Sequence, residues 1–272
     1  MIARVRVAGV VGAAAVMAWG PGAAGAPAET PASNWFVVQP SVQKPDGAFP
    51  LVSVHRSVIT ACGRSCVRAV RKGAHVRPVG VDGALRAAIA VTGALRYDTE
   101  PFDEIQLKVS PPTELLVSDG FTPRPTTMFT PTGDVQRALE KFVRSVDELT
   151  IDQSVKLKGS LKRLPRTTAF RFTAGGRERV VAVVDGPALA IATLNARGQW
   201  VLQHLEQAAL VTDSVDAEAF HVLAVVDMDG DGVPEIVALE QIEESWWHLV
   251  YRYDRDGDGT WSIVARRPGS TV

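Results

Sequence analysis

The feature that most constrains the fold is a regular succession of short apolar segments in the last part of the chain. From Thr167 onward, apolar-rich runs alternate with turn sequences such as Gly-Gly, Asp-Gly-Pro and Asn-Ala-Arg-Gly. Short runs with turn residues between them are typical of strands, and the tight turns favour antiparallel pairing of neighbours. We therefore predict strands over 168–173, 179–184, 188–194, 199–205, 220–226, 234–241, 246–253 and 260–266.

These predicted strands carry a weak internal repeat. The sequence VVAVVDG from Val180 matches VLAVVDMDGDG from Val222, 42 residues further on. An apolar strand, a turn and a tryptophan-containing strand follow each match. Propeller blades repeat at about 40–45 residues with four strands each, so the pattern predicts an antiparallel, propeller-blade-like meander. Two such units do not close a propeller, and one sheet with a repeated hairpin is the alternative.

The region before the meander contains one helix pattern and several strand-like runs. Residues 132–149 place Val135, Leu139, Phe142, Val143 and Val146 on one stripe at helical spacing, which predicts a helix packed on a sheet. Upstream, strand-like runs occur at 34–38, 51–59, 104–109 and 113–117, residues 84–97 fit helix or strand, and 111–131 is typical of a loop or edge. The predicted fold class is mainly β (α+β).

The N-terminus has the pattern of a secretory signal peptide. Arg4 and Arg6 precede an apolar run at 7–19, and small residues follow at Ala24 and Ala26. The run is shorter than the roughly 20 residues that a membrane-spanning helix needs, so cleavage after Ala26 or Ala28 and export are favoured over a membrane anchor. The predicted divisions are 1–26 signal peptide, 27–33 flexible leader, 34–131 β-rich region, 132–166 helix and connector, and 167–272 meander.

Charge and cysteine content narrow the function classes. The formal net charge is -1, which argues against a nucleic-acid-binding protein with its basic face. No later segment is long and apolar enough to span a bilayer. The two cysteines, Cys62 and Cys66, are predicted to form a structural disulfide in an oxidising compartment, with a redox or metal role as the alternative.

The sequence DMDGDGVPEIV at 227–237 concentrates carboxylates just before an apolar strand. Such like charges repel unless a cation lies among them. Gly230 and Gly232 permit the backbone to curl, because glycine reaches positive φ without a steric cost. Oxygen atoms at alternate positions suit a cation of calcium's size, whereas Mg²⁺ resists losing its waters and zinc calls for His or Cys. The alternative is a solvated acidic turn without an ion.

This stretch resembles the calcium loop of FG-GAP or VCBS-type repeats, in which DxDGDGxxD/E precedes an apolar strand. It differs from an EF-hand, because strands flank it and position twelve is Ala238. The resemblance covers roughly residues 220–266 and implies a propeller blade stiffened by Ca²⁺. The ligands that it implies are Asp227, Asp229, Asp231, the carbonyl of Val233, and Glu235.

A second acidic stretch, DRDGDGTW at 254–261, repeats the spacing less completely. Asp254, Asp256, Asp258 and Thr260 can form a weaker ion site, but position nine is Ser262, a poorer ligand. A plain β-hairpin turn at Asp-Gly is the favoured interpretation.

The sequence contains none of the common catalytic motifs: GxSxG, HExxH, a P-loop and GxGxxG are all absent. His204, His221 and His248 fall in predicted strands, where packed or surface histidines are commoner than catalytic ones. Trp246 and Trp247 face opposite sides of a strand, so they do not form one sugar-stacking surface.

Two functions from different classes remain. The first is an exported, calcium-stabilised binding or interaction protein without catalysis, with a protein or polysaccharide as its ligand. The second is a secreted hydrolase whose active site the sequence does not reveal. A concave pocket with convergent polar groups away from the acidic loop favours the hydrolase, and a flat sheet face favours the binding protein.

Overall fold

Antiparallel sheets make up most of the structure, a computed structural model, which confirms the predicted mainly β class. The described residues are 33–38, 47–96, 103–150, 166–186, 188–207, 220–242, 245–255 and 259–268. They all belong to one compact unit, Pro31–Val272. The predicted signal peptide, 1–26, lies outside the described residues, and the first strand begins at Ser33, the last residue of the predicted leader. No described helix has the length and apolarity to cross a membrane.

The N-terminal region forms a 7-stranded sheet in the order β1-β7-β4-β5-β6-β2-β3. Because β1 also pairs with β2, the strands from β1 to β2 close into a small barrel. Its apolar core includes Phe36, Val76, Ile105 and Leu116. The strands are β1 Ser33–Val38, β2 Gly47–His55, β3 Val58–Ala61, β4 His75–Val79, β5 Ile89–Leu95, β6 Glu104–Leu107 and β7 Leu115–Ser118.

One strand prediction in this region is wrong. Residues 51–59 are not a single strand but the hairpin of β2 and β3, with the turn at Arg56 and Ser57. Both turn residues have positive φ, 50° and 62°, which non-glycine residues seldom adopt. A tight turn without Gly, Asn or Asp carries no sequence signal, so the hairpin could not be anticipated.

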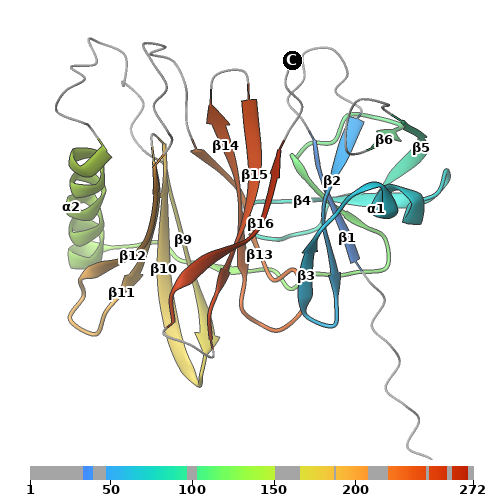
Figure 1. Ribbon diagram of the computed structural model, residues 1–272. Helices are drawn as coiled ribbons and strands as arrows, with labels where there is room; N and C mark the ends of the chain where they lie inside the picture. Colours follow the sequence, from blue (N-terminus) through green and yellow to red (C-terminus); the bar gives the residue numbers. More distant parts are fainter. Residues whose placement is uncertain are drawn as a thin grey trace, which may run out of the picture. The chain divides into compact units, whose positions relative to one another are not determined.

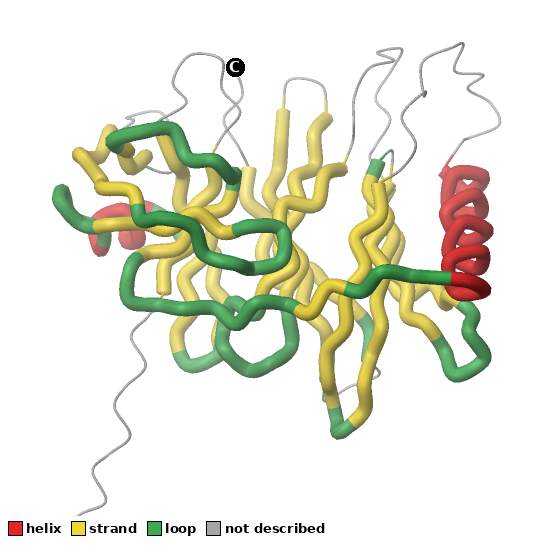
Figure 2. The backbone as a smooth tube through the Cα atoms, turned by 180° about the vertical axis from the view of Figure 1, so that it is seen from behind, coloured by secondary structure: helices red, strands yellow, loops and turns green. Residues whose placement is uncertain are grey.

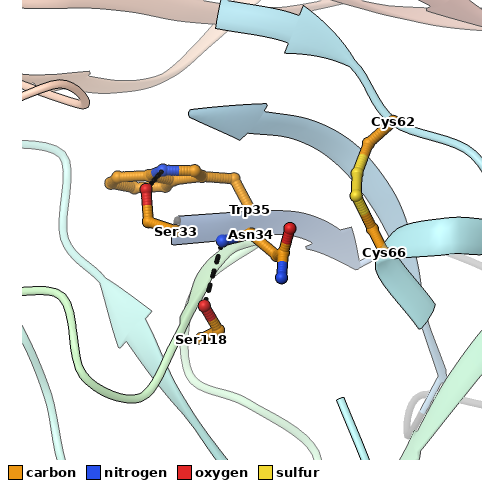
Figure 3. The surroundings of a disulfide bond; sticks show 6 residues. All are labelled: Ser33, Asn34, Trp35, Cys62, Cys66 and Ser118. Atoms are coloured by element: carbon orange, nitrogen blue, oxygen red, sulfur yellow. Dashed lines mark hydrogen bonds between the residues drawn. A yellow bond between two sulfur atoms is a disulfide. The ribbon is translucent and has the colours of Figure 1, made fainter. Parts of the chain in front are cut away.

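The predicted disulfide joins β3 to a short helix. Cys62 follows β3, Cys66 lies in α1 (Arg64–Ala69), and their Cα atoms are 6.0 Å apart (Figure 3). The first strand lies beside this bridge in the same view. There the backbone N–H of Asn34 donates to Ser118 Oγ at 2.9 Å and the Trp35 indole donates to Ser33 Oγ at 3.1 Å. The bridge holds the end of β3 to the helix, and the two hydrogen bonds hold the first residues of β1.

The segment after β7 runs from the barrel to the second sheet (Figure 2). Thr126 donates its N–H to Asp82 O and its hydroxyl to Val225 O, both at 2.8 Å. The short strand β8 (Thr127–Met128) then pairs with β9 (Arg166–Ala174). The region predicted as loop or edge therefore ties three sheets together before the long helix begins.

The 5-stranded sheet, in the order β12-β11-β10-β9-β8, is covered by the predicted helix α2 (Gly133–Thr150) (Figure 1). Its remaining strands are β10 Arg177–Asp185, β11 Ala188–Leu194 and β12 Trp200–Gln207. The sheet face below the helix is rich in alanine, which lets the helix approach closely. The helix residues Val135, Leu139, Phe142, Val143 and Val146 pack there against Ala169, Ala182, Ala190, Ala192 and Trp200. This confirms the predicted packing of the helix on a sheet.

The predicted meander, 167–272, is divided between two sheets: β9 to β12 belong to the 5-stranded sheet, and the last four strands form a 4-stranded sheet in the order β13-β14-β15-β16. Its strands are β13 Phe220–Val226, β14 Glu235–Ile242, β15 Ser245–Tyr253 and β16 Trp261–Pro268. Both of its faces are buried: Val225, Leu249 and Tyr251 pack against the 5-stranded sheet, whereas Val226 and Val250 pack against the barrel. It is the central layer of the described fold.

Candidate metal centre

The acidic loop joins β13 to β14, where the structure pairs Val226 with Glu235. The loop turns sharply after each of its last two aspartates. Gly230 has a φ of 79° and Gly232 a φ of 87°, so both glycines use the left-handed conformation that the sequence predicted for them. The loop therefore curls back over the end of the central sheet.

Main-chain amides of the loop orient its carboxylates. Asp227 accepts two such bonds, from Gly230 N at 2.7 Å and Gly232 N at 2.9 Å. Each of the other acidic residues uses one oxygen in this way. The bonds are Asp231 N to Asp229 Oδ1 at 3.0 Å, Val233 N to Asp231 Oδ1 at 2.8 Å, and Met228 N to Glu235 Oε2 at 2.9 Å. One oxygen each on Asp229, Asp231 and Glu235 is thereby left to face a common partner.

Three of the predicted ligands meet closely. One carboxylate oxygen from each of Asp227, Asp229 and Glu235 lies within 4.8 Å of the others. Asp227 and Glu235 are almost fully buried, with 3% and 1% of their surfaces exposed. This buried acidic cluster can hold a metal ion. Asp231 is adjacent through its hydrogen bonds but does not belong to the group of three.

A guanidinium group, which the sequence did not predict, faces the remaining oxygens. Arg252 on β15 donates to Asp229 Oδ2 at 2.5 Å and Asp231 Oδ2 at 3.1 Å, and its Nε lies 3.6 Å from Glu235 Oε1. Arg255 also pairs with Asp231. The pairing of β14 with β15 explains this contact. Ile236 pairs with Tyr251, so Glu235 and Arg252 are neighbours across the sheet.

Burial disfavours the ionised form of the carboxylates in this cluster. Desolvation, followed by repulsion from Asp231, raises the pKa of Asp229 to about 6. Desolvation likewise raises the pKa of Asp227, and it raises the pKa of Glu235 well above its ordinary value. Arg252 and Arg255 pair with three of the four carboxylates, and with all four ionised the loop carries two more negative charges than these arginines balance. That excess matches the charge of one divalent cation.

The second acidic loop lies partly outside the described residues, since Asp256 and Asp258 are not among them. Its ends meet as a hairpin, with the N–H of Asp254 donating to Thr260 O at 2.8 Å. The predicted turn geometry is therefore present at the ends of the loop. Within the described part of the chain, the only group of His, Cys, Asp and Glu residues close enough for a metal is the Asp227 cluster.

The three strand histidines lie in different environments. His248 is buried, and desolvation lowers its pKa to about 3, so it is a neutral core residue. His204 contacts the ring of Tyr251 edge-on, with ring centroids 5.2 Å apart. His221 has its Nδ1 3.4 Å from Asp185 Oδ2 and 3.1 Å from Arg166 Nη1. His221 also lines a cavity, which its sequence context did not indicate.

The adjacent tryptophans of β15 face opposite sides, as predicted. Trp247 packs on the side of the 5-stranded sheet and Trp246 on the side of the barrel. Trp247 also lies below the guanidinium of Arg266, whose carbon is 4.9 Å from the ring centroid. They therefore do not form one aromatic platform.

Comparison with known proteins gives no family. No protein-family model, no curated protein and no solved structure matches the chain.

Proposed function

We propose that the protein is an exported binding or interaction protein without catalysis, and that its loop Asp227–Glu235 takes up Ca²⁺ as a structural ion. The observation that carries this proposal is the convergence of the Asp227, Asp229 and Glu235 oxygens within 4.8 Å. The excess of carboxylates over arginines around the same point supports it.

The choice of calcium follows from the donor set. All side-chain donors are carboxylate oxygens, which a hard cation prefers, and no His or Cys belongs to the group. The loop also resembles FG-GAP or VCBS-type calcium loops, which suggests a stiffened strand connection that leaves another surface to bind a protein or a polysaccharide. Export through residues 1–26 would place the loop where calcium is plentiful, so a millimolar affinity would suffice.

Thermal unfolding of the mature chain tests the proposal. Calcium at ten times its dissociation constant adds about 1.4 kcal/mol to the folded state, which raises Tm by roughly 3–6 °C. Asp229→Asn should abolish this rise. Asp134→Asn on α2, an exposed residue, is the matched control and should keep it. Identical melting in calcium and in a chelator would refute the proposal.

A secreted hydrolase is the second candidate, and one observation favours it. A polar cavity away from the acidic loop is lined by His221, whose Nδ1 lies near the buried carboxylate of Asp185. A carboxylate at Nδ1 can orient an imidazole as a general base. Chromogenic ester and glycoside substrates, tested with the mature protein and with His221→Asn, decide this: turnover that the variant loses would support the enzyme.

A further inference from the structure

A small cavity lies where the three sheets approach one another. It has a volume of about 270 Å³ and is lined by Glu114, Arg166, His221, Leu239 and Gln241. Glu114 precedes β7 of the barrel, Arg166 begins β9, and the other residues belong to β13 and β14. Ligand pockets usually measure roughly 300–1,000 Å³, so this cavity suits one small ring and not an extended chain.

The imidazole of His221, which lines the cavity, is held through its Nδ1 atom. Asp185, only 3% exposed, accepts the N–H of Val222 at 2.9 Å and lies 3.4 Å from His221 Nδ1. Arg166 Nη1 is 3.1 Å from the same nitrogen. With Nδ1 engaged, Nε2 is the ring nitrogen that remains for a ligand.

Glu114, which also lines the cavity, carries an unsatisfied acceptor. Glu114 Oε2 is buried and has no hydrogen-bond partner among the described residues. A buried acceptor of this kind costs free energy unless a donor reaches it. Desolvation also raises the pKa of Glu114, and the nearby His221 opposes this shift. A ligand with a donor group would satisfy this oxygen once the carboxyl group rotates about its terminal bond towards the cavity, because Oε2 itself is fully buried.

The chemistry of the lining selects the ligand class. Glu114 and Arg166 carry opposite charges, so the cavity has no strong preference for a cation or an anion. Its polar groups include acceptors, donors and the amide of Gln241, which is both. Hydroxyl groups both donate and accept, so a polyhydroxylated ring can satisfy all of them. Leu239 provides an apolar surface for the carbon face of such a ring.

We infer that this cavity binds one monosaccharide unit, with hydroxyls that contact Glu114, His221 and Gln241. The site is separate from the acidic loop and requires neither a bound metal nor a hydrolytic step. It gives the protein a ligand of defined chemistry, the exposed sugar of a glycan.

Saturation-transfer NMR and calorimetry on the mature protein test this inference. The probes are glucose, galactose, mannose and N-acetylglucosamine, with acetate and ammonium as ionic alternatives. At least one sugar should bind, and Glu114→Gln and Gln241→Ala should each weaken it at least tenfold. Glu140→Gln and Gln136→Ala on α2 are matched controls and should leave the affinity unchanged.

The variants' melting curves verify that they fold, and His221→Asn supplies a third test from a different strand. The inference is overturned if no sugar of the panel binds, if only acetate or ammonium binds, or if the cavity variants bind as tightly as the controls. Adding a chelator should not change the sugar affinity, which separates this test from that of the calcium loop.

Discussion

The two repeated meanders, β10–β12 and β13–β15, differ mainly in the connection after their first strand. Asp185 ends the first strand of one repeat, and Asp227, 42 residues later, follows that of the other. Both are only 3% exposed. The first repeat turns at once into β11, whereas the second inserts the acidic loop before β14.

Both equivalent aspartates accept hydrogen bonds from main-chain amides, but the amides belong to different parts of the fold. Asp185 accepts the N–H of Val222 on the neighbouring sheet and contacts His221, so it joins two layers. Asp227 accepts Gly230 and Gly232 within its own loop, so it shapes a cluster of carboxylates. The repeated strands supply a common frame, and the length of one connection decides which site is built on it.

Replacing the long connection with the short one gives the largest expected effect. Substituting one glycine for residues 228–233 recreates the Asp-Gly-Pro sequence of the first repeat. Met228 and Val233 are buried, so their loss should lower the free energy of unfolding by about 4 kcal/mol. Calorimetry should also show no calcium-dependent change in Tm. A calcium response that survives would place the ion elsewhere.

Removing the equivalent aspartates compares their tasks directly. Asp227→Ala removes two part-buried hydrogen bonds and should cost about 2 kcal/mol, whereas Asp185→Ala removes one and should cost about 1 kcal/mol. Denaturant unfolding measures both. Equal losses would show that the two positions are not distinguished by the number of amides that they bind.

Arg252 tests whether a cation in the acidic loop 227–235 competes with the Arg252 guanidinium for the same carboxylates. Because the guanidinium contacts Asp229, Asp231 and Glu235, Arg252→Gln should raise calcium affinity about tenfold, or about 1.4 kcal/mol.

The same variant should melt lower than the parent protein without metal. Arg255→Gln, which removes a contact with Asp231 but with no member of the Asp227 cluster, should change the calcium affinity less. Unchanged calcium affinity in Arg252→Gln would show that the arginine and the ion do not share a position.

The smallest effect is a pH dependence that only the second repeat should show. The pKa of Asp229 is about 6 in the folded protein, against about 3.9 for a free aspartate, so the folded state binds the proton more tightly. Without metal, stability should therefore rise as the pH falls from 7 towards 4. Asp229→Asn should reduce this rise, and Asp227 and Glu235, whose pKa values are also raised, should keep part of it. Calcium affinity should fall over the same range, because protons compete for the carboxylates.

Many of the strands in the two repeats could be predicted from the sequence, because apolar runs bounded by turn residues indicate where a strand begins and ends. The predicted strands over 188–194 and 220–226 coincide with β11 and β13. The helix stripe from Val135 to Val146 also predicted its contacts. Gly230 and Gly232 also indicated that the acidic loop curls, because glycine adopts positive φ without a steric cost, and both glycines have positive φ in the structure.

What escaped prediction depends on contacts between distant segments. The barrel closes through the pairing of β1 with β2 and β7, which no local pattern specifies. Arg252 reaches the acidic loop from another strand, and Glu114, just before β7, lines the same cavity as His221 on β13. The turn at Arg56 and Ser57 lacks the Gly, Asn or Asp that usually marks a hairpin turn with positive φ.

The double-sided burial of the 4-stranded sheet limits how the protein can be divided. A fragment that begins at Thr167 would retain the acidic loop but uncover Val226, Met228, Leu239 and Val250, which now pack towards the barrel. Such a contiguous apolar surface promotes aggregation. The loop would then sit on an insoluble piece, so the barrel serves as an obligatory solubilising partner for the very repeat that carries the acidic residues.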